Sequence, residues 1–492
     1  MVGKEARSGG ASSVYERHRP ERTLLYRLVG EHYPRLKAHL AAQDRGLPGY
    51  VEREFEDYLR CGRLEHGFLR VRCERCRAER LVAFSCKRRG FCPSCGARRM
   101  VESAALLVDE VFPEQPVRQW VLSVPHPLRF LFASRPEVMS RVLGIVYRVI
   151  AAHLIKKAGC SHKTAQTGAV TLIQRFGSAL NLNIHFHMLF LDGVYVERPD
   201  GAVRFRSVRA PTAAELTRLT ETIARCVGRS LERQGLLERD AENSYLVGDE
   251  CEGGPMAELM GASITYRVAI GPQQGRKVFT LQTLPAGAEP GDDGVGKVAG
   301  FSLHAGVAAR AQERKKLERL CRYISRPPVA EKRLSLTSGG NVRYQLKTPY
   351  RDGTTHVLFE PLDFIARLAA LVPKPRVNLT RFHGVFAPNS RYRARVTPAG
   401  RGKGRRLTKR NPDDSPPGEC HAAMTWAQRL KRVFNIDIET CTACGGALRI
   451  IACIEEPAVI EKILAHLDAK TERATTARSP PTRAPPPGRL CE

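Results

Sequence analysis

Apolar positions follow two different periods along the 492-residue chain. Spacings of three and four residues predict helices from about residue 23 to 58, and again at 137–158, 213–234 and 308–324. Strand-like runs lie between these helices at 120–124, 169–176 and 264–270. This mixture predicts an α+β fold for residues 117–333.

The remaining segments differ in composition. Short strands at 341–348 and 355–361 and a helix at 361–371 predict an extension of the same domain. Residues 391–410 carry nine Lys or Arg and no acid, which is typical of a flexible basic linker. The predicted segments are a helical region at 1–60, a zinc-binding domain at 61–100, the α+β domain at 117–333, its extension at 334–390, the linker at 391–420, a small CxxC module at 421–470 and a disordered tail at 471–492.

Residues 184–191, Ile-His-Phe-His-Met-Leu-Phe-Leu, alternate as a strand does. His185 and His187 therefore point to the same face, about 6.5–7 Å apart along the backbone. Two imidazoles so placed can share one divalent metal if a third ligand comes from elsewhere. The alternative is a half-buried strand whose histidines are satisfied by hydrogen bonds.

The charge balance points to a polyanionic partner. Lys and Arg total 79 against 50 acidic residues, a formal net charge of +29. Each cation that neutralises a phosphate releases condensed counterion, so nucleic acid is the expected partner, ahead of a ribosomal or membrane-surface role. No apolar run reaches about 18 residues and the N-terminus lacks an apolar signal core, which predicts a cytoplasmic protein without a membrane partner.

Cysteines occur as CxxC pairs, which favours zinc over disulfides. Cys73-x2-Cys76 and Cys92-x2-Cys95 have the spacing of a four-thiolate ribbon holding one structural zinc. Three neighbours, Cys61, His66 and Cys86, either form a second site or exchange with the first. The later pair, Cys441 and Cys444, is half a ribbon, for which zinc with Cys453, Cys420 or His466 and plain burial remain alternatives.

A tyrosine on a basic helix is the candidate nucleophile. Leu317, Leu320 and Ile324 form an apolar stripe, and Tyr323 lies off it. The cations flanking the tyrosine are Arg319, Arg322 and Arg326. A phenol among cations and beside a metal is a better nucleophile, whereas most helical tyrosines only pack. No GxxxxGK[ST] loop occurs, so no nucleotide cofactor is expected.

Five segments in one order carry a family resemblance: FCPSCGARRM (91–100), QRFGSALNLNIHFHMLFLDGVY (174–195), CRYISRPP (321–328), VPKPRVNLTRFHGVFAPNSRYR (372–393) and MTWAQRLKRVFNIDIETCTACGG (424–446). The chain resembles the insertion sequence ninety-one family of transposases, which belong to the HUH (histidine–hydrophobic–histidine) single-strand endonucleases. The resemblance runs from about residue 50 to 467.

The resemblance implies a reaction and a fold. His185 and His187 would hold Mg2+ or Mn2+ against the scissile phosphate of single-stranded DNA at the element's ends. Tyr323 would attack, leaving a 5′-phosphotyrosine and a free 3′-hydroxyl, and the reverse reaction would rejoin strands without ATP. This chemistry supports rolling-circle-type transposition. The implied fold is a five-stranded antiparallel sheet flanked by helices, with the histidine strand central.

Two features depart from the family's pattern or are left open by it. Some members carry two tyrosines four residues apart, but positions 319 and 327 here are Arg and Pro. A single nucleophile favours a homo-oligomer or sequential use of one tyrosine. The third metal ligand is expected to be His304, with Gln282, Gln174 and His126 as successive alternatives. Arg175 and Asp192 flank the histidine strand and either position the site or cap loops.

Two rival functions are compatible with parts of this pattern. A replication initiator or conjugative relaxase uses the same chemistry for another purpose. A non-catalytic zinc-ribbon DNA-binding protein would treat the two histidines and Tyr323 as packing residues. The cysteine module ahead of the nuclease and the RYISRPP segment favour the transposase.

Overall fold

The computed structural model describes residues 13–14, 19–199, 202–239, 244–246, 254–283, 295–401, 428, 436–437 and 439–476. The chain divides into two units. The small unit comprises residues 1–21, 60–86 and 435–492, and the large unit comprises 22–59 and 87–434. The predicted linker beyond residue 401 and the predicted tail beyond residue 476 lie outside the described residues.

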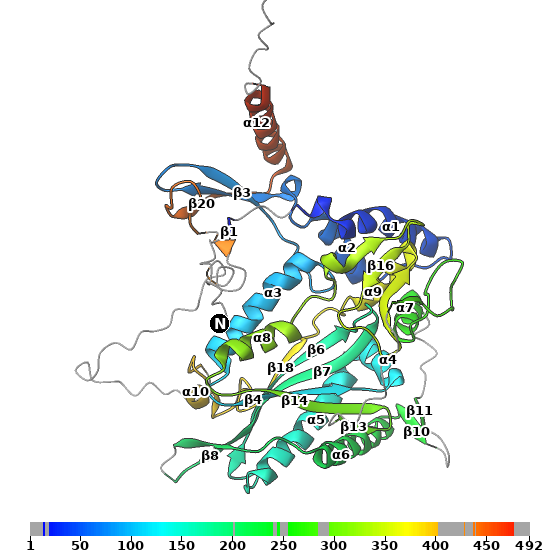
Figure 1. Ribbon diagram of the computed structural model, residues 1–492, viewed down its shortest axis with the longest axis vertical. Helices are drawn as coiled ribbons and strands as arrows, with labels where there is room; N and C mark the ends of the chain where they lie inside the picture. Colours follow the sequence, from blue (N-terminus) through cyan, green and yellow to red (C-terminus); the bar gives the residue numbers. More distant parts are fainter. Residues whose placement is uncertain are drawn as a thin grey trace, which may run out of the picture. The chain divides into compact units, whose positions relative to one another are not determined.

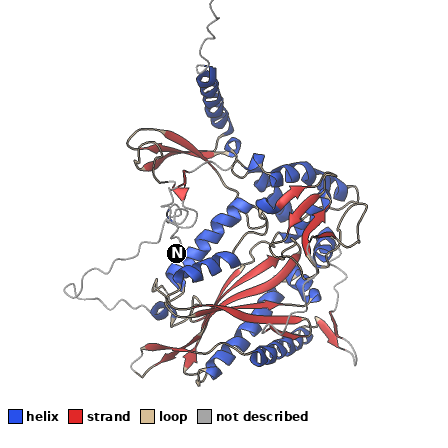
Figure 2. Ribbon diagram, in the orientation of Figure 1, coloured by secondary structure: helices blue, strands red, loops and turns tan. Residues whose placement is uncertain are grey.

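The large unit mixes helices and strands, as predicted (Figure 2). Its helices are α1 (Leu24–Ala41), α2 (Gly49–Arg60), α3 (Pro93–Ala105), the π-helix η3 (Leu106–Val111), α4 (His126–Ser134), α5 (Pro136–Lys157), α6 (Ala213–Glu232), α7 (Pro255–Ile264), α8 (Arg314–Ile324), α9 (Pro361–Leu371) and α10 (Arg393–Val396). Short 3-10 turns are η1 (Pro20–Arg22) and η5 (Glu331–Arg333).

Three of its sheets contain three or more strands. The main sheet has the order β13 (Val295–Val298), β14 (Phe301–Ala309), β4 (Val117–Ser123), β7 (Leu182–Leu191), β6 (Gly168–Phe176), β18 (Thr380–Gly384). A second has the order β12 (Phe279–Gln282), β17 (Thr354–Phe359), β16 (Val342–Gln345), β15 (Leu334–Leu336), and a third β5 (Ala165–Gln166), β8 (Gly193–Glu197), β9 (Val203–Ser207). A hairpin pairs β10 (Leu237–Arg239) with β11 (Ser244–Leu246).

The main sheet is antiparallel throughout. The predicted histidine strand is β7, which lies inside the sheet between β4 and β6. The structure describes six strands in this sheet, against the five that the family resemblance implied. One edge strand of the sheet, β18, belongs to the predicted extension at 334–390 and pairs with β6.

The two faces of β7 pack against different helices. Phe186 stacks with Phe132 of α4 at 6.1 Å, and Phe190 stacks with Tyr147 of α5 at 5.7 Å between ring centroids. On the opposite face, Leu189 belongs to the apolar cluster that contains Leu317 of α8. Figure 1 shows α3 and α8 on one side of the sheet and α5 and α6 on the other. Alternate residues of β7 therefore belong to two separate apolar cores, one on each face of the main sheet.

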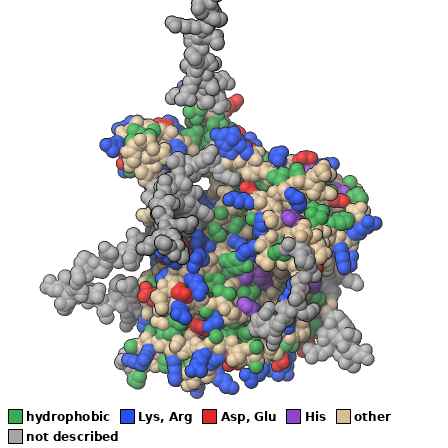
Figure 3. Space-filling model, viewed as in Figure 1, with side chains coloured by type: hydrophobic (Ala, Val, Ile, Leu, Met, Phe, Trp, Pro, Cys, Tyr) green, Lys and Arg blue, Asp and Glu red, His purple; other side chains and the backbone are tan. Residues whose placement is uncertain are grey.

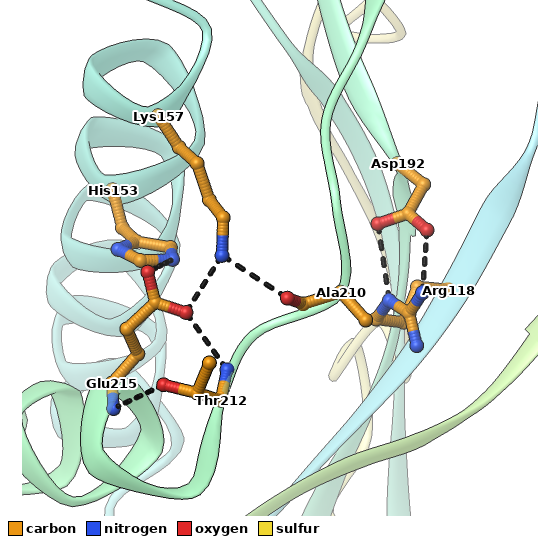
Figure 4. Close-up of polar contacts among 7 residues, drawn as sticks. All are labelled: Arg118, His153, Lys157, Asp192, Ala210, Thr212 and Glu215. Carbon is orange, nitrogen blue, oxygen red and sulfur yellow. Dashed lines mark hydrogen bonds and ion pairs between the residues drawn. The ribbon is translucent and has the colours of Figure 1, made fainter.

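Helix α5 is long and apolar enough to cross a membrane by length and composition, but half of its apolar window is buried inside the fold. It packs against α4 and α6. Lys157 at its end donates to Glu215 Oε2 at 2.6 Å, and Glu215 also closes a capping box with Thr212 at the start of α6 (Figure 4). These contacts are those of a core helix.

Two predicted elements are wrong. Residues 308–324 were expected to be one helix, but β14 continues to Ala309 and α8 begins only at Arg314. Small residues in this stretch suit either structure, and pairing with β4 decides for the strand. The run 264–270 was expected to be a strand, but α7 occupies its start and only an isolated bridge, Arg267 to Lys277, follows.

The small unit joins distant parts of the chain in one sheet. Its elements are β1 (Ser13–Val14), η2 (Leu64–His66), β2 (Phe68–Cys73), β3 (Glu79–Ala83), β19 (Ile436–Asp437), β20 (Leu448–Ile454) and α12 (Pro457–Thr476). The order β20-β2-β3 places a strand of the C-terminal module beside the predicted N-terminal zinc-binding segment. Another such pair is β1 with β19.

Close approach of α3 to the segment after α8 requires a glycine. A Cβ built at Gly96 would lie 2.5 Å from Pro327 Cβ. We expect Gly96→Ala to lower the free energy of unfolding by about 1–3 kcal/mol, since the proline ring and the helix must move apart. Gly144→Ala on α5 is the matched control, because its Cβ meets only the flexible end of Arg148. That change is expected to be neutral or to stabilise by up to about 1 kcal/mol. Urea unfolding measures both, and equal effects would contradict the packing argument.

Candidate functional site

Register in the main sheet collects polar side chains on the α8 face. His185 is paired with Gln174 on β6, and His187 lies two residues further along the same face of β7. The Nε2 atoms of the two histidines are 3.1 Å apart and their ring centroids 4.8 Å apart. The strand and the shared direction of the two imidazoles agree with the sequence prediction.

A chain of hydrogen bonds runs through both histidines. The Gln119 side-chain amide lies 2.7 Å from His187 Nδ1, and His185 Nδ1 lies 2.9 Å from the carbonyl of Asn183. The carbonyl of Asn183 can only accept, so His185 carries its hydrogen on Nδ1 and its Nε2 presents a lone pair. Gln119 was missed at the sequence level, because only strand pairing brings β4 beside β7.

Both imidazoles are held neutral. Burial, the larger effect, lowers the pKa of His185 to about 4, and Arg326 and Arg129 oppose its protonation too. Burial followed by the neighbouring His185 lowers the pKa of His187 to about 2. Only the neutral form of an imidazole has a nitrogen lone pair to donate, so protonation does not prevent the two histidines from binding a cation at neutral pH.

The geometry of the pair fits two ligands of one ion. With a metal–nitrogen distance of about 2.1 Å, a separation of 3.1 Å between nitrogens corresponds to an angle of about 95° at the metal. That is the angle between adjacent ligands of an octahedron, the geometry of Mg2+. Among the described residues, no His, Cys, Asp or Glu joins both histidines in a cluster of three ligand atoms within 4.8 Å.

The expected third ligand, His304, is not in contact with the pair. It lies in the same row of the sheet as His187, but Val121 of β4 stands between them. A Cβ built at Gly306 would lie 2.9 Å from His304 Nε2, so the imidazole lies along its own strand. The third ligand stays a prediction.

Of the alternatives, Gln174 lies nearest, directly opposite His185. Its Nε2 donates to the Ile324 carbonyl at 3.2 Å, and its Oε1 accepts from Arg326 at 3.3 Å. Gln282 is exposed on β12 of the second sheet, and His126 begins α4.

Tyr323 faces the histidines from α8. Leu317, Leu320 and Ile324 are buried and Tyr323 is 39% exposed, which confirms the predicted stripe. The rings of Tyr323 and His187 meet edge to face with centroids 6.2 Å apart. In Figure 3, histidine side chains are visible in a hollow of the large unit over β6 and β7, with Lys and Arg side chains around it.

Two cations lie against the tyrosine ring. The Arg326 guanidinium is 4.2 Å from the ring centroid and donates to the Tyr323 carbonyl at 2.6 Å. Lys347 Nζ is 4.0 Å from the same centroid. Arg326 was expected because it lies three residues after Tyr323 in the sequence, whereas Lys347 follows β16 and had no signal in the sequence.

Asp192 has a structural partner rather than a place in the site. Its two carboxylate oxygens accept from Arg118 at 3.0 and 2.7 Å, and both residues are buried (Figure 4). Arg118 also donates to the carbonyl of Ala305 at 3.0 Å, beside the irregularity in β14 that follows His304. The pair fixes β14 and the end of β7 to β4.

The cysteines are grouped differently from the prediction. Cys73 and Cys76 do not share a ribbon with Cys92 and Cys95. Their partners are in the C-terminal module: Cys73 Sγ lies 3.5 Å from Cys444 Sγ, and Cys76 Sγ lies 3.6 Å from Cys441 Sγ. The spacing rule failed because two CxxC pairs can meet through strand pairing, here β2 with β20, as well as through short separation.

This cluster has the geometry of a structural zinc site. All four sulfurs lie within 4.8 Å of one another, and a zinc–sulfur distance of about 2.3 Å predicts sulfur separations of about 3.8 Å in a tetrahedron. The backbone N–H of Cys76 donates to Cys73 Sγ at 3.5 Å and lowers the pKa of that thiol to about 6. Glycine is required at position 446 beside this thiol, since a Cβ built there would lie 3.0 Å from Cys73 Sγ.

Each unit holds two of the other cysteines of the module. In the small unit, the backbone N–H of Cys86 lies 3.3 Å from Cys61 Sγ. In the large unit, Cys92 and Cys95 are buried at the start of α3. Cys86, Cys92 and Cys95 fall within ten residues of sequence, so a second zinc site with Cys61 stays a prediction.

Comparison with protein families adds to this geometry. A family model described as "Putative transposase" matches residues 168–393, and one described as "Transposase zinc-binding domain" matches residues 28–124. The chain belongs to the insertion sequence ninety-one family of transposases. No curated protein and no solved structure matches it.

The family assignment confirms the predicted membership of this transposase family. A transposase acts on DNA, so DNA is the partner of this strongly basic chain. Structural zinc is supported both by the zinc-binding family model and by the cysteine clusters. The match favours the transposase over the initiator and the regulator considered above.

Zinc content distinguishes the two ways of grouping the cysteines. We expect Cys441→Ser with Cys444→Ser to lose one zinc ion per chain and to unfold the small unit at a lower temperature, because two of four ligands are removed. Elemental analysis and thermal unfolding measure these changes. The control is Cys160→Ser with Cys226→Ser, which should keep the metal. An unchanged zinc content in the Cys441 and Cys444 variant would contradict the cluster described here and favour the predicted ribbon of Cys73, Cys76, Cys92 and Cys95.

Proposed function

We propose that this transposase nicks and rejoins single-stranded DNA at the ends of an insertion sequence, with Tyr323 as the nucleophile. The observation that carries the proposal is the meeting of Tyr323 and the histidine pair on one face of the main sheet, with Tyr323 and His187 rings 6.2 Å apart. Exposure of the tyrosine allows a strand to reach it from solvent.

The reaction is a transesterification. The Tyr323 oxygen attacks the scissile phosphorus, the bond to the 3′ oxygen breaks, and that oxygen ends with the proton that the phenol loses. The product is a 5′-phosphotyrosine, which keeps the energy of the phosphodiester bond. Attack by another 3′-hydroxyl reverses the step and rejoins strands, so no nucleotide cofactor is consumed. Repeated on one strand, this chemistry supports rolling-circle-type transposition.

The histidine pair is suited to hold Mg2+ or Mn2+ against the scissile phosphate. When bound, such an ion polarises a phosphoryl oxygen and stabilises the charge that develops on attack. His185 already presents Nε2. His187 must carry its hydrogen on Nδ1 to do the same, and rotating the Gln119 amide by half a turn places a carbonyl oxygen to accept it. Gln119 would thus position His187.

Cations beside the phenol complete the proposed machinery. Arg326 and Lys347 lie within 4.2 Å of the Tyr323 ring centroid, where their positive charge attracts the phosphates of the strand. A lone nucleophile on α8 carries out one covalent attachment at a time. A full cycle therefore uses Tyr323 in sequence or engages two copies of the chain.

Loss of the phenol hydroxyl should abolish the covalent product. We expect Tyr323→Phe to form no protein–DNA adduct with a labelled single-stranded oligonucleotide of the element's end in Mn2+, while binding of the strand is retained. Tyr350→Phe is the control, and EDTA should abolish the adduct of the unchanged protein. Denaturing electrophoresis detects the adduct. Binding without cleavage in every divalent metal tested would disprove the proposal.

Replacement of Gln119 separates positioning from catalysis. Gln119→Leu removes the partner of His187 Nδ1 and should weaken the apparent Mn2+ affinity by about 10–100-fold. Gln119→Glu should preserve or tighten it, because a carboxylate accepts the Nδ1 hydrogen. The measurement is adduct yield as a function of Mn2+ concentration. Equal metal dependence in both variants would show that Gln119 only packs.

A further inference from the structure

A pocket lined with arginines lies beside the tyrosine helix, and apart from Arg326 these arginines have no role in the reaction described above. Within the large unit, a cavity of about 270 Å³ is bounded by the start of α3, strand β6 and the segment after α8. We call it the arginine pocket. Its cationic lining is Arg88, Arg89, Arg99, Arg175 and Arg326.

Few carboxylates balance these charges. Arg88 forms an ion pair with Asp57. Glu54 accepts the Gly90 N–H at 2.6 Å and lies near the pocket, where burial raises the pKa of its carboxyl and the nearby arginines oppose that rise. Among the residues that the structure describes, the remaining four arginines have no carboxylate within 4.0 Å. These four arginines donate to backbone carbonyls and to the Gln174 side-chain amide.

Arg175 is the most costly of these charges. Its side chain is 8% exposed, and it donates to the carbonyls of Leu371 and Ala370 at 3.3 and 3.4 Å. Burial lowers its pKa to about 10, so it remains a cation at neutral pH. A buried cation held only by long bonds to carbonyls is poorly compensated, and an anion that enters the cavity would offset that cost.

The arginine pocket is continuous with the site. Arg326 donates to Gln174 Oε1 at 3.3 Å, and Gln174 is the strand partner of His185. The same guanidinium lies 4.2 Å from the centre of the Tyr323 ring. A strand whose scissile phosphate lies at Tyr323 therefore has a neighbouring phosphate within reach of this cavity.

We propose that the arginine pocket binds an internucleotide phosphate of the single strand, next to the phosphate that Tyr323 attacks. The proposal rests on the proposed function for the identity of the strand. Guanidinium groups match phosphate oxygens in pairs, which favours this ligand over a base or an apolar group. The volume lies near the lower limit of ligand pockets, about 300–1,000 Å³, so it admits a phosphate with its sugar but no duplex.

The test compares two variants that each lose two positive charges. Arg89→Gln with Arg99→Gln removes cations of the pocket. The control, Arg218→Gln with Arg225→Gln, removes two exposed cations of α6. Fluorescence anisotropy measures binding of a labelled single-stranded oligonucleotide in EDTA over a series of salt concentrations.

For the pocket variant we expect binding weaker by about tenfold per arginine, as for a lost charge-assisted hydrogen bond. Each phosphate contact on a single strand contributes about 0.7 to the slope of log affinity against log salt, so the slope should fall by about 1.4. The control should change neither quantity appreciably. Equal affinity and slope in the two variants would overturn the proposal.

Two further measurements keep the outcome unambiguous. Arg89→Gln alone, whose side chain is exposed, gives the same test with half the effect if the double variant does not fold. A duplex of the same sequence should compete poorly, and equal competition would overturn the proposal for a single strand. If the salt slope is lower in the pocket variant than in the unchanged protein, but the unchanged protein forms no adduct, the proposed function is wrong and phosphate binding by the pocket is supported. If the unchanged protein forms adducts while the pocket variant binds the strand with unchanged affinity and slope, the proposed function is supported and phosphate binding by the pocket is wrong.

Discussion

Antiparallel pairing of β4, β7 and β6 is the constraint on which the site depends. This register places Gln119, His187, His185 and Gln174 on one face, beneath α8. A slip of one residue in β7 would turn both imidazoles toward α4 and α5 and bring phenylalanines to the tyrosine. The aromatic stacking of Phe186 and Phe190 therefore specifies the position of the histidines as firmly as any contact of the histidines themselves.

Features that depend on local periodicity were predictable from the sequence. The direction of the histidine pair, the exposure of Tyr323 and helix α9 all follow from alternation or helical spacing. Features created by strand pairing were not. Gln119 and Lys347 reach the site from elements far away in sequence, and the cysteine partners lie 365 or more residues apart. The 308–324 stretch failed because its small residues suit both strand and helix.

Basic charge is distributed unevenly between surface and interior. Most of the excess of 29 positive charges can be solvated at little cost. Arg175 and Arg326, in contrast, are partly or fully buried, and no carboxylate of the described part of the chain forms an ion pair with them. Gln174 connects the arginine pocket with the histidine site, since its side-chain amide contacts both Arg326 and the end of α8. Gln174 is also the strand partner of His185. A change of charge in the arginine pocket that moves the Gln174 side chain would therefore also change the surroundings of the histidine pair.

The four-cysteine cluster has a consequence for how the chain is made. Cys73 and Cys76 emerge from the ribosome long before their partners, because Cys441 follows Cys76 by 365 residues. At about 5–20 residues per second, that interval is roughly 20–70 seconds. During this time the early thiols are open to oxidation or to the wrong metal. The small unit can complete its fold only after the large unit has been synthesised.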